Sequence, residues 1–120
     1  LRTAADATPL FASGSWDKTA RLWDLISGEE LRCFQGHGDC VSSVFLRENL
    51  LATGSWDRTA RLWDVQSGYE LMKFEGHSDL VWSVFLGVRQ LATGSRDTTA
   101  RCWDVQTGRE LKRFEGHSEA

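Results

Sequence analysis

Residues 54–86 read GSWDRTARLWDVQSGYELMKFEGHSDLVWSVFL, and this stretch decides the fold because the chain repeats it. An earlier copy, GSWDKTARLWDLISGEELRCFQGHGDCVSSVFL, begins at Gly14, and a shorter one, GSRDTTARCWDVQTGRELKRFEGHSEA, begins at Gly94. The shift is 40 residues both times, and 26 of 40 aligned positions are identical between the first two units. A repeat of this length predicts an array of similar units, each built on one supersecondary motif.

Inside one unit the pattern is typical of short strands joined by tight turns. The strands expected in the central unit are 40–46, 50–55, 59–64 and 69–74, which are rich in apolar, aromatic or alternating residues. Turn residues separate the strands in the stretches GHSD, RENL, SWDR and VQSG. No segment of ten or more residues shows the apolar stripe of a helix. We therefore expect an all-β chain of four-stranded antiparallel meanders.

Neighbouring units are expected to stack face to face, because one such sheet cannot bury both of its faces alone. The 40-residue period, the repeated Gly-His pair and the endings LWD (22–24 and 62–64) and CWD (102–104) together resemble the WD-repeat (WD40) family of β-propellers. The resemblance covers roughly residues 10–119. It implies that each unit is one propeller blade.

The repeat also suggests where each blade begins and ends. The expected divisions are 1–9 as a ragged first strand, 10–35 as strands two to four of blade 1, 36–75 as blade 2, 76–114 as blade 3, and 115–120 as the start of a further, truncated repeat. Asp6 stands where the sister units have Leu46 and Leu86, so the first strand of blade 1 is doubtful.

The WD-repeat resemblance further implies a hydrogen-bonded tetrad in each blade, which ties the loop before the first strand to the second and third strands. Two complete sets recur at identical spacing: His37, Ser55, Asp57 and Trp63, then His77, Ser95, Asp97 and Trp103. Two partial sets remain: Ser15, Asp17 and Trp23 without an upstream histidine, and His117 without the residues that would follow it. An indole N–H, a hydroxyl, an imidazole and a carboxylate can satisfy one another in series when buried. We expect the tetrads to be structural.

The tetrads contain Ser, His and Asp, the residue types of a catalytic triad, so a hydrolase is a remote alternative. Nucleophilic catalysis needs one activated serine in a cleft beside an oxyanion hole. A constellation that recurs in every blade, beside a bulky tryptophan, indicates architecture instead. We expect no enzymatic activity.

Cys33, His37 and Cys40 lie close together in the sequence and superficially suggest zinc. Neither cysteine recurs in the sister units, and His37 already belongs to a tetrad. Cys102 replaces Leu22 and Leu62, which predicts a small packed side chain rather than a ligand. We expect no metal and no cofactor.

The charge and composition of the chain indicate which classes of binding partner to expect. With 14 basic and 17 acidic residues the net charge is -3, which gives no electrostatic reason to expect nucleic acid or an anionic membrane. No apolar run reaches the length of a membrane span, and residues 1–11 lack a signal-peptide pattern. The three cysteines are too few and too widely spaced for a disulfide scaffold, which favours a reducing, intracellular location in the cytoplasm or nucleus.

Three blades do not close a ring, because propellers have about 4 to 8. Either this chain is a segment of a longer propeller, or copies assemble head to tail until the ring closes. The poor first strand favours the segment. In an assembly, His117 of one chain would complete the set of Ser15, Asp17 and Trp23 in the next.

The family resemblance implies a rigid, non-catalytic platform that binds protein partners, often through the end of the blades where the tetrad loops lie. The residues that it places there are Trp16, Cys40, Ser42, Trp56, Leu80, Trp82 and Arg96. Trp and Arg are enriched at interface hot spots, although exposed tryptophans also cover turns. One specific role is substrate recognition in a ubiquitin ligase adaptor; the alternative is an engineered or duplicated oligomer with no evolved ligand.

Overall fold

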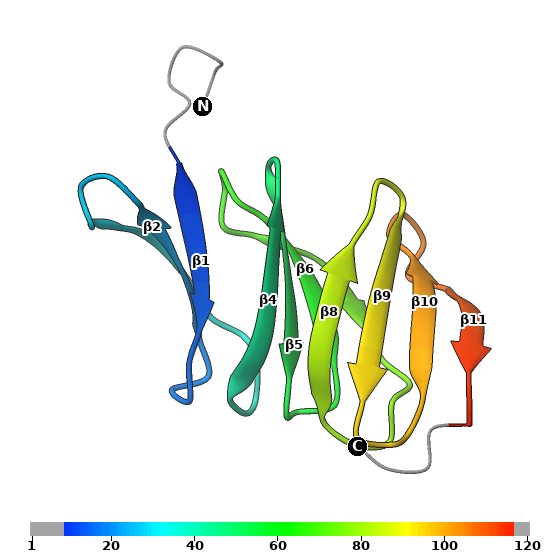
Figure 1. The fold of residues 1–120 in the computed structure, drawn as a ribbon. Coiled ribbons are helices and arrows are strands. Elements are labelled where there is room, and N and C mark those ends of the chain that lie inside the picture. Colours follow the sequence, from blue (N-terminus) through cyan, green and yellow to red (C-terminus); the bar gives the residue numbers. More distant parts are fainter. Residues whose placement is uncertain (1–8, 117–120) are drawn as a thin grey trace.

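The computed structural model describes residues 9–116, which form eleven β-strands in three antiparallel sheets and no helix (Figure 1). The strands are β1 (Leu10–Gly14), β2 (Ala20–Asp24), β3 (Glu30–Phe34), β4 (Val41–Arg47), β5 (Leu50–Ser55), β6 (Ala60–Asp64), β7 (Glu70–Phe74), β8 (Val81–Leu86), β9 (Gln90–Ser95), β10 (Ala100–Asp104) and β11 (Glu110–Phe114). The predicted all-β fold of meandering sheets is confirmed.

Each sheet is one blade, and its strands follow the order of the chain. Blade 1 is β1–β3, blade 2 is β4–β7 and blade 3 is β8–β11. In blade 2 the register pairs Leu51 with Trp63 and Gly54 with Ala60, and the same register recurs in the other blades at a spacing of 40 residues. The doubtful first strand of blade 1 is expected at residues 1–9, of which residues 1–8 lie outside the described residues, as does His117.

Turn chemistry closes each meander at its outer hairpin. After β6 the carboxylate of Asp64 accepts the backbone N–H of Ser67, and Gly68 adopts a φ of 82°. A residue with a Cβ is strained at this φ, so glycine at this position ends the turn without cost. Gly28 and Gly108 occupy the same place after β2 and β10.

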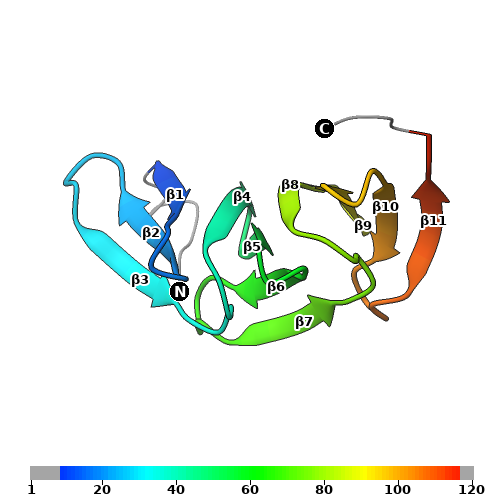
Figure 2. The ribbon, with the colours of Figure 1, turned by 90° about the horizontal axis from the view of Figure 1, so that it is seen from below.

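The blades stand side by side in an open arc. Figure 2 shows the inner strands β4 and β8 along the concave side and the outer strands β3, β7 and β11 along the convex side. Blade 2 therefore has a neighbour on both faces, whereas blades 1 and 3 each have one within residues 9–116.

Two apolar clusters fill the spaces between blades. Strand alternation sends Leu51, Trp63 and Val65 of blade 2 toward blade 1, and sends residues such as Leu62 and Phe74 toward blade 3. All five side chains are 5% exposed or less. Because the buried surface lies between blades rather than within them, each blade needs its neighbour for stability.

The residues that the structure describes include no helix long and apolar enough to cross a membrane.

Candidate functional site

Each complete blade carries a buried chain of hydrogen bonds that begins at a tryptophan. In blade 2 the indole N–H of Trp63 donates to Oγ1 of Thr53 at 2.9 Å, and this hydroxyl lies 2.7 Å from Nε2 of His37. Nδ1 of His37 lies 2.8 Å from the carboxylate of Asp57. The ionised carboxylate can only accept, so the imidazole donates its Nδ1–H to it; in the neutral ring Nε2 then accepts from the hydroxyl of Thr53, which itself accepts from the indole. The chain therefore joins the loop before β4 to β5 and β6.

Blade 3 repeats this chain with Trp103, Thr93, His77 and Asp97, at 2.9, 2.7 and 2.7 Å. Both histidines are only 6% exposed, and no buried side-chain nitrogen or oxygen among residues 9–116 lacks a hydrogen-bond partner. The polar groups beneath the loops are thus fully satisfied, which is the condition for a stable buried network.

The hydroxyl in the chain is Thr53 or Thr93, so the prediction that Ser55 and Ser95 supply it is wrong. Leu51 lies opposite Trp63 in the sheet, and Thr53 is two residues from that position on the same face. Ser55 is two residues further, about 6.6 Å along the strand, beyond reach of the indole. Its hydroxyl donates to the backbone oxygen of Cys40 at 2.8 Å and accepts the N–H of Asp57.

An ion-pair cluster around the tetrad carboxylate was missed from the sequence. Arg61 is 9% exposed, and its guanidinium contacts Glu70 at 2.9 Å and Asp57 at 3.6 Å. Thr59 also donates its hydroxyl to Asp57. Thr, Arg and Glu recur at these positions in all three units, so recurrence alone could have identified them. The recurring arginine of each blade pairs with the aspartate of that blade's network.

Blade 1 has an incomplete version of the network. Trp23 donates to Oγ of Ser13 at 2.9 Å, again two residues upstream of the predicted Ser15. Asp17 pairs with Arg21 at 2.9 Å, and no histidine within residues 9–116 reaches either group. Asp17 is also half exposed, whereas Asp57 and Asp97 are largely covered.

The buried network predicts how the stability of the fold depends on pH. Burial lowers the pKa of His77 below its ordinary value of about 6.5, although Asp97 beside it acts in the opposite direction. The unfolded chain then binds a proton that the folded chain does not, so stability is full above about pH 6.5 and falls as the pH drops through that value. We expect the midpoint of urea unfolding to decrease from about pH 8 to about pH 5, with a smaller decrease for His77→Gln. An equal slope for both proteins would contradict a neutral, buried His77.

The buried aspartates affect the stability of the fold at lower pH than His77 does. Burial raises the pKa of Asp97, but hydrogen bonds from Thr99, His77 and the N–H of Ser78 outweigh it and hold the pKa far below its usual range. The resulting stability is present above the unfolded pKa of about 3.9 and is lost as the pH falls through the folded value.

The geometry gives no support to the hydrolase alternative. Ser55 and His37 share no hydrogen bond, both ring nitrogens of His37 have partners, and Thr53 is 0% exposed. A nucleophile needs a free approach for substrate. Residues 9–116 also contain no group of three His, Cys, Asp or Glu side chains placed to hold a metal ion.

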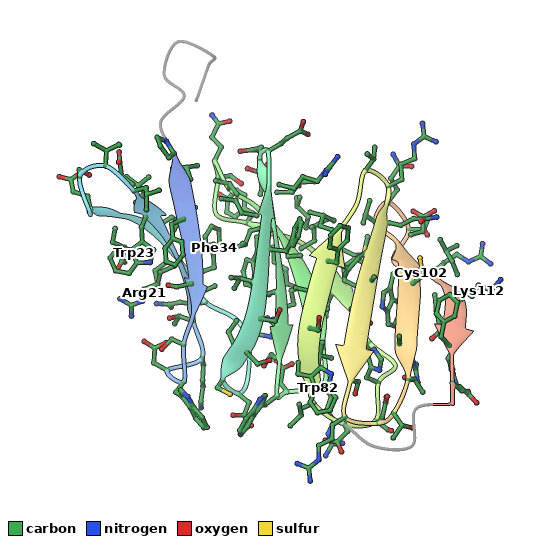
Figure 3. All side chains as sticks on the ribbon, viewed as in Figure 1. Arg21, Trp23, Phe34, Trp82, Cys102 and Lys112 are labelled. Atoms are coloured by element: carbon green, nitrogen blue, oxygen red, sulfur yellow. The ribbon has the colours of Figure 1, made fainter. Side chains whose placement is uncertain are left out.

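The predicted partner-binding residues lie at one end of the blades, where the β1–β2, β5–β6 and β9–β10 loops are. Trp16 and Trp56, from neighbouring blades, pack edge to face with ring centroids 4.8 Å apart. Trp16 is nevertheless 77% exposed, and Trp56 and Trp82 are each 38% exposed. Figure 3 shows Trp82 at the same end, where β8 begins. We call Trp16, Trp56, Trp82 and Arg96 the rim.

The other three candidates serve the fold instead or lie beneath the rim. Cys40 is 4% exposed, and burial raises the pKa of its thiol. The hydroxyl of Ser42 donates to the backbone oxygen of Val81 in blade 3 at 2.6 Å, so it joins two blades. Leu80 is half-buried, and its backbone oxygen accepts from Arg96 and Ser95. Cys40 is therefore a packing residue, whereas Ser42 is exposed and also joins two blades through its hydroxyl.

The stretches of this chain that match known proteins coincide with its repeats. A family model described as "WD domain, G-beta repeat" matches residues 5–24, 28–64 and 68–104. Dynein assembly factor with WD repeat domains 1 of Homo sapiens is 47% identical over 34 residues, which are 28% of this chain and 8% of that protein. Nuclear distribution protein PAC1-2 of Postia placenta is 45% identical over 42 residues, which are 34% of this chain and 10% of that protein.

The same architecture occurs among solved structures. The crystal structure of the computationally designed Ika8 protein superposes with a TM-score of 0.84 at 29% identity, over 94% of this chain and 36% of that one. The present chain thus spans about a third of that chain, and its matched stretches span a tenth or less of the two relatives.

Proposed function

Because the chain belongs to the WD40 repeat family, we propose that it is a rigid, non-catalytic scaffold that binds a protein partner through the rim of Trp16, Trp56, Trp82 and Arg96. Repeats of this family form interaction scaffolds, which supports the general role. The choice of the rim as the contact surface is specific to this chain.

The exposure of Trp16 is the observation that carries the proposal. Its ring packs against Trp56, yet 77% of the residue remains in contact with solvent. The edge-to-face contact with Trp56 orients the ring while most of it stays exposed, so a partner can pack against it. Large aromatic side chains lose little conformational entropy on binding and often supply most of the binding energy.

Arg96 indicates what else the partner should carry. It is 64% exposed and lies 4.0 Å from Asp79, which is itself 46% exposed. Such a surface pair contributes about 0–1 kcal/mol, so a carboxylate from a partner can replace Asp79 easily. The rim therefore fits a protein segment with apolar side chains flanked by an acidic residue.

Selection from a peptide library displayed on phage tests this function. We expect peptides that combine apolar and acidic residues, and we expect Trp16→Ala or Trp56→Ala to weaken their binding at least tenfold, which is about 1.4 kcal/mol. Arg96→Glu should reduce binding of the acidic peptides in particular. Affinities are measured by fluorescence titration of labelled peptide.

Tyr69→Ala is the matched control. Tyr69 is 74% exposed, but it precedes β7 and so lies at the opposite end of blade 2 from Trp56. Its replacement should leave peptide affinity within about twofold. The proposal fails if the library gives no binder, or if Tyr69→Ala weakens binding as much as Trp16→Ala does.

The finer expectations stay predictions. Substrate recognition in a ubiquitin ligase is one scaffold role, and affinity for a degradation signal peptide on the rim is its test. An intracellular location, in the cytoplasm or nucleus, is supported by the three free thiols of Cys33, Cys40 and Cys102.

A further inference from the structure

The loop before β4 runs between the two paired tryptophans of the rim. The N–H of Val41 donates to the backbone oxygen of Ser15, the residue before Trp16, at 2.9 Å. One residue earlier in the loop, the backbone oxygen of Cys40 accepts from the N–H of Trp56 at 3.0 Å. The loop is therefore fastened on one side next to the tryptophan of blade 1 and on the other side to the tryptophan of blade 2.

Asp39, in the same loop, places a carboxylate beside Trp56. Asp79 and Arg96 lie 40 residues after Asp39 and Trp56, and Nε of Arg96 is 4.0 Å from Oδ2 of Asp79. In both blades Oδ1 of the aspartate accepts the N–H of the next residue at 2.7 Å, so the two carboxylates are turned the same way. Trp56 therefore stands next to the Asp39 carboxylate, as Arg96 stands next to Asp79.

Asp39 differs from the other aspartates at this end of the blades because it lacks a cation. The others each pair with an arginine: Asp17 with Arg21 at 2.9 Å, Asp57 with Arg61 at 3.6 Å, Asp79 with Arg96 at 4.0 Å and Asp97 with Arg101 at 3.8 Å. No ion pair within residues 9–116 includes Asp39, which is exposed. A partner that covers Trp56 therefore also covers an uncompensated negative charge.

The chemistry of this corner selects the group that can cover it. An apolar or acidic group would remove water from the Asp39 carboxylate without replacing its hydrogen bonds, which is unfavourable. The face of an indole is the negative part of the ring and attracts a cation, more strongly than the face of any other side chain. A basic side chain satisfies both, since its alkyl stem packs on the rings while its charged head reaches the carboxylate.

We propose that Trp16, Trp56 and Asp39 form a site for a lysine or arginine side chain of the bound protein. This inference rests on the proposed function, because the two tryptophans belong to the rim. It adds a basic residue to the acidic residue that Arg96 selects. The two charged contacts have opposite signs, and one lies between blades 1 and 2 while the other lies on blade 3. Together they fix the direction in which the bound segment runs along the rim.

Paired peptides from the library test the site. A selected peptide that contains lysine is compared with the same peptide carrying norleucine there, which keeps the stem and removes the charge; an arginine peptide is compared with its citrulline form. By fluorescence titration we expect the protein to bind the charged form about tenfold more tightly. Asp39→Asn retains the acceptor for the N–H of Cys40 but lacks the charge, so it should reduce this preference to about threefold or less.

Two further variants locate the effect. Asp79→Asn makes the same change in blade 3, beside Arg96, and should leave the preference for the charged peptide within about twofold of its original value. Trp16→Leu keeps an apolar surface but removes the negative ring face. It should therefore weaken the lysine peptide more than the norleucine peptide, which a loss of packing alone would not do.

The outcomes separate this inference from the scaffold role. Peptides that bind the rim without a preference for lysine or arginine would overturn the basic-residue site and leave the scaffold proposal standing. The same holds if Asp39→Asn keeps the preference intact, or if Asp79→Asn reduces it equally. A library without any binder contradicts the scaffold role, and the site fails with it. Circular dichroism of each variant checks that the fold is intact.

Discussion

Replacement of Thr53 by Val lowers the free energy of unfolding by about 2–6 kcal/mol, although the two side chains have nearly the same shape. The hydroxyl of Thr53 accepts from Trp63 and donates to His37, and Thr53 is 0% exposed. Valine leaves a buried donor and a buried acceptor without partners. Each unsatisfied group costs about 1–3 kcal/mol, and water cannot replace the hydroxyl at a fully buried site.

Ser13→Ala is the matched comparison. Ser13 holds the same position in blade 1, but within residues 9–116 its side chain bonds only to Trp23, which is half-buried. Its loss should cost about 1 kcal/mol, since water can reach the indole. Urea unfolding monitored by tryptophan fluorescence gives both values. The two variants could lose equal amounts of unfolding free energy, or Thr53→Val could lose less than Ser13→Ala. Either result would mean that the network does not hold blade 2 together.

Replacement of Gly54 by Ala pushes blades 2 and 3 apart and lowers the free energy of unfolding by about 1–3 kcal/mol. A Cβ at Gly54 would lie 2.9 Å from Cγ1 of Val81 and 3.0 Å from Cγ1 of Val84 in the next blade. Valine has few rotamers, so neither side chain can turn away easily. The clash must instead shift β8 away from β5.

Gly94→Ala makes the same change at the corresponding position of blade 3. The nearest atom there, Nε1 of Trp82, is 3.5 Å from the Cβ position, which is an ordinary contact. Because alanine reduces the entropy of the unfolded chain, this variant should be neutral or more stable by about 0.4–1 kcal/mol. Thermal unfolding at low concentration measures both variants. A loss of stability for Gly94→Ala as large as that for Gly54→Ala would show that neither effect arises between blades.

The repeat length, the strand order and the types of group in the buried network could all be predicted from the sequence. Repetition made this possible, because any residue needed for packing between like blades must recur at the same spacing. Thus Trp63, His37 and Asp57 were correctly assigned to one buried network. The same recurrence was available for Thr53 and Glu70, but their roles were not recognised.

Only the tertiary structure decided which hydroxyl completes the network and which candidate surface residues are exposed. Ser55 and Thr53 lie on the same side of one strand, so spacing in the sequence cannot separate them; the register of β5 against β6 does. In the same way Cys40 and Trp16 look equally suited to a surface, yet one is 4% exposed and the other 77%. Local pattern determines which residues alternate, whereas burial depends on the neighbouring blade, and this neighbour is known only when the sheets are placed in space.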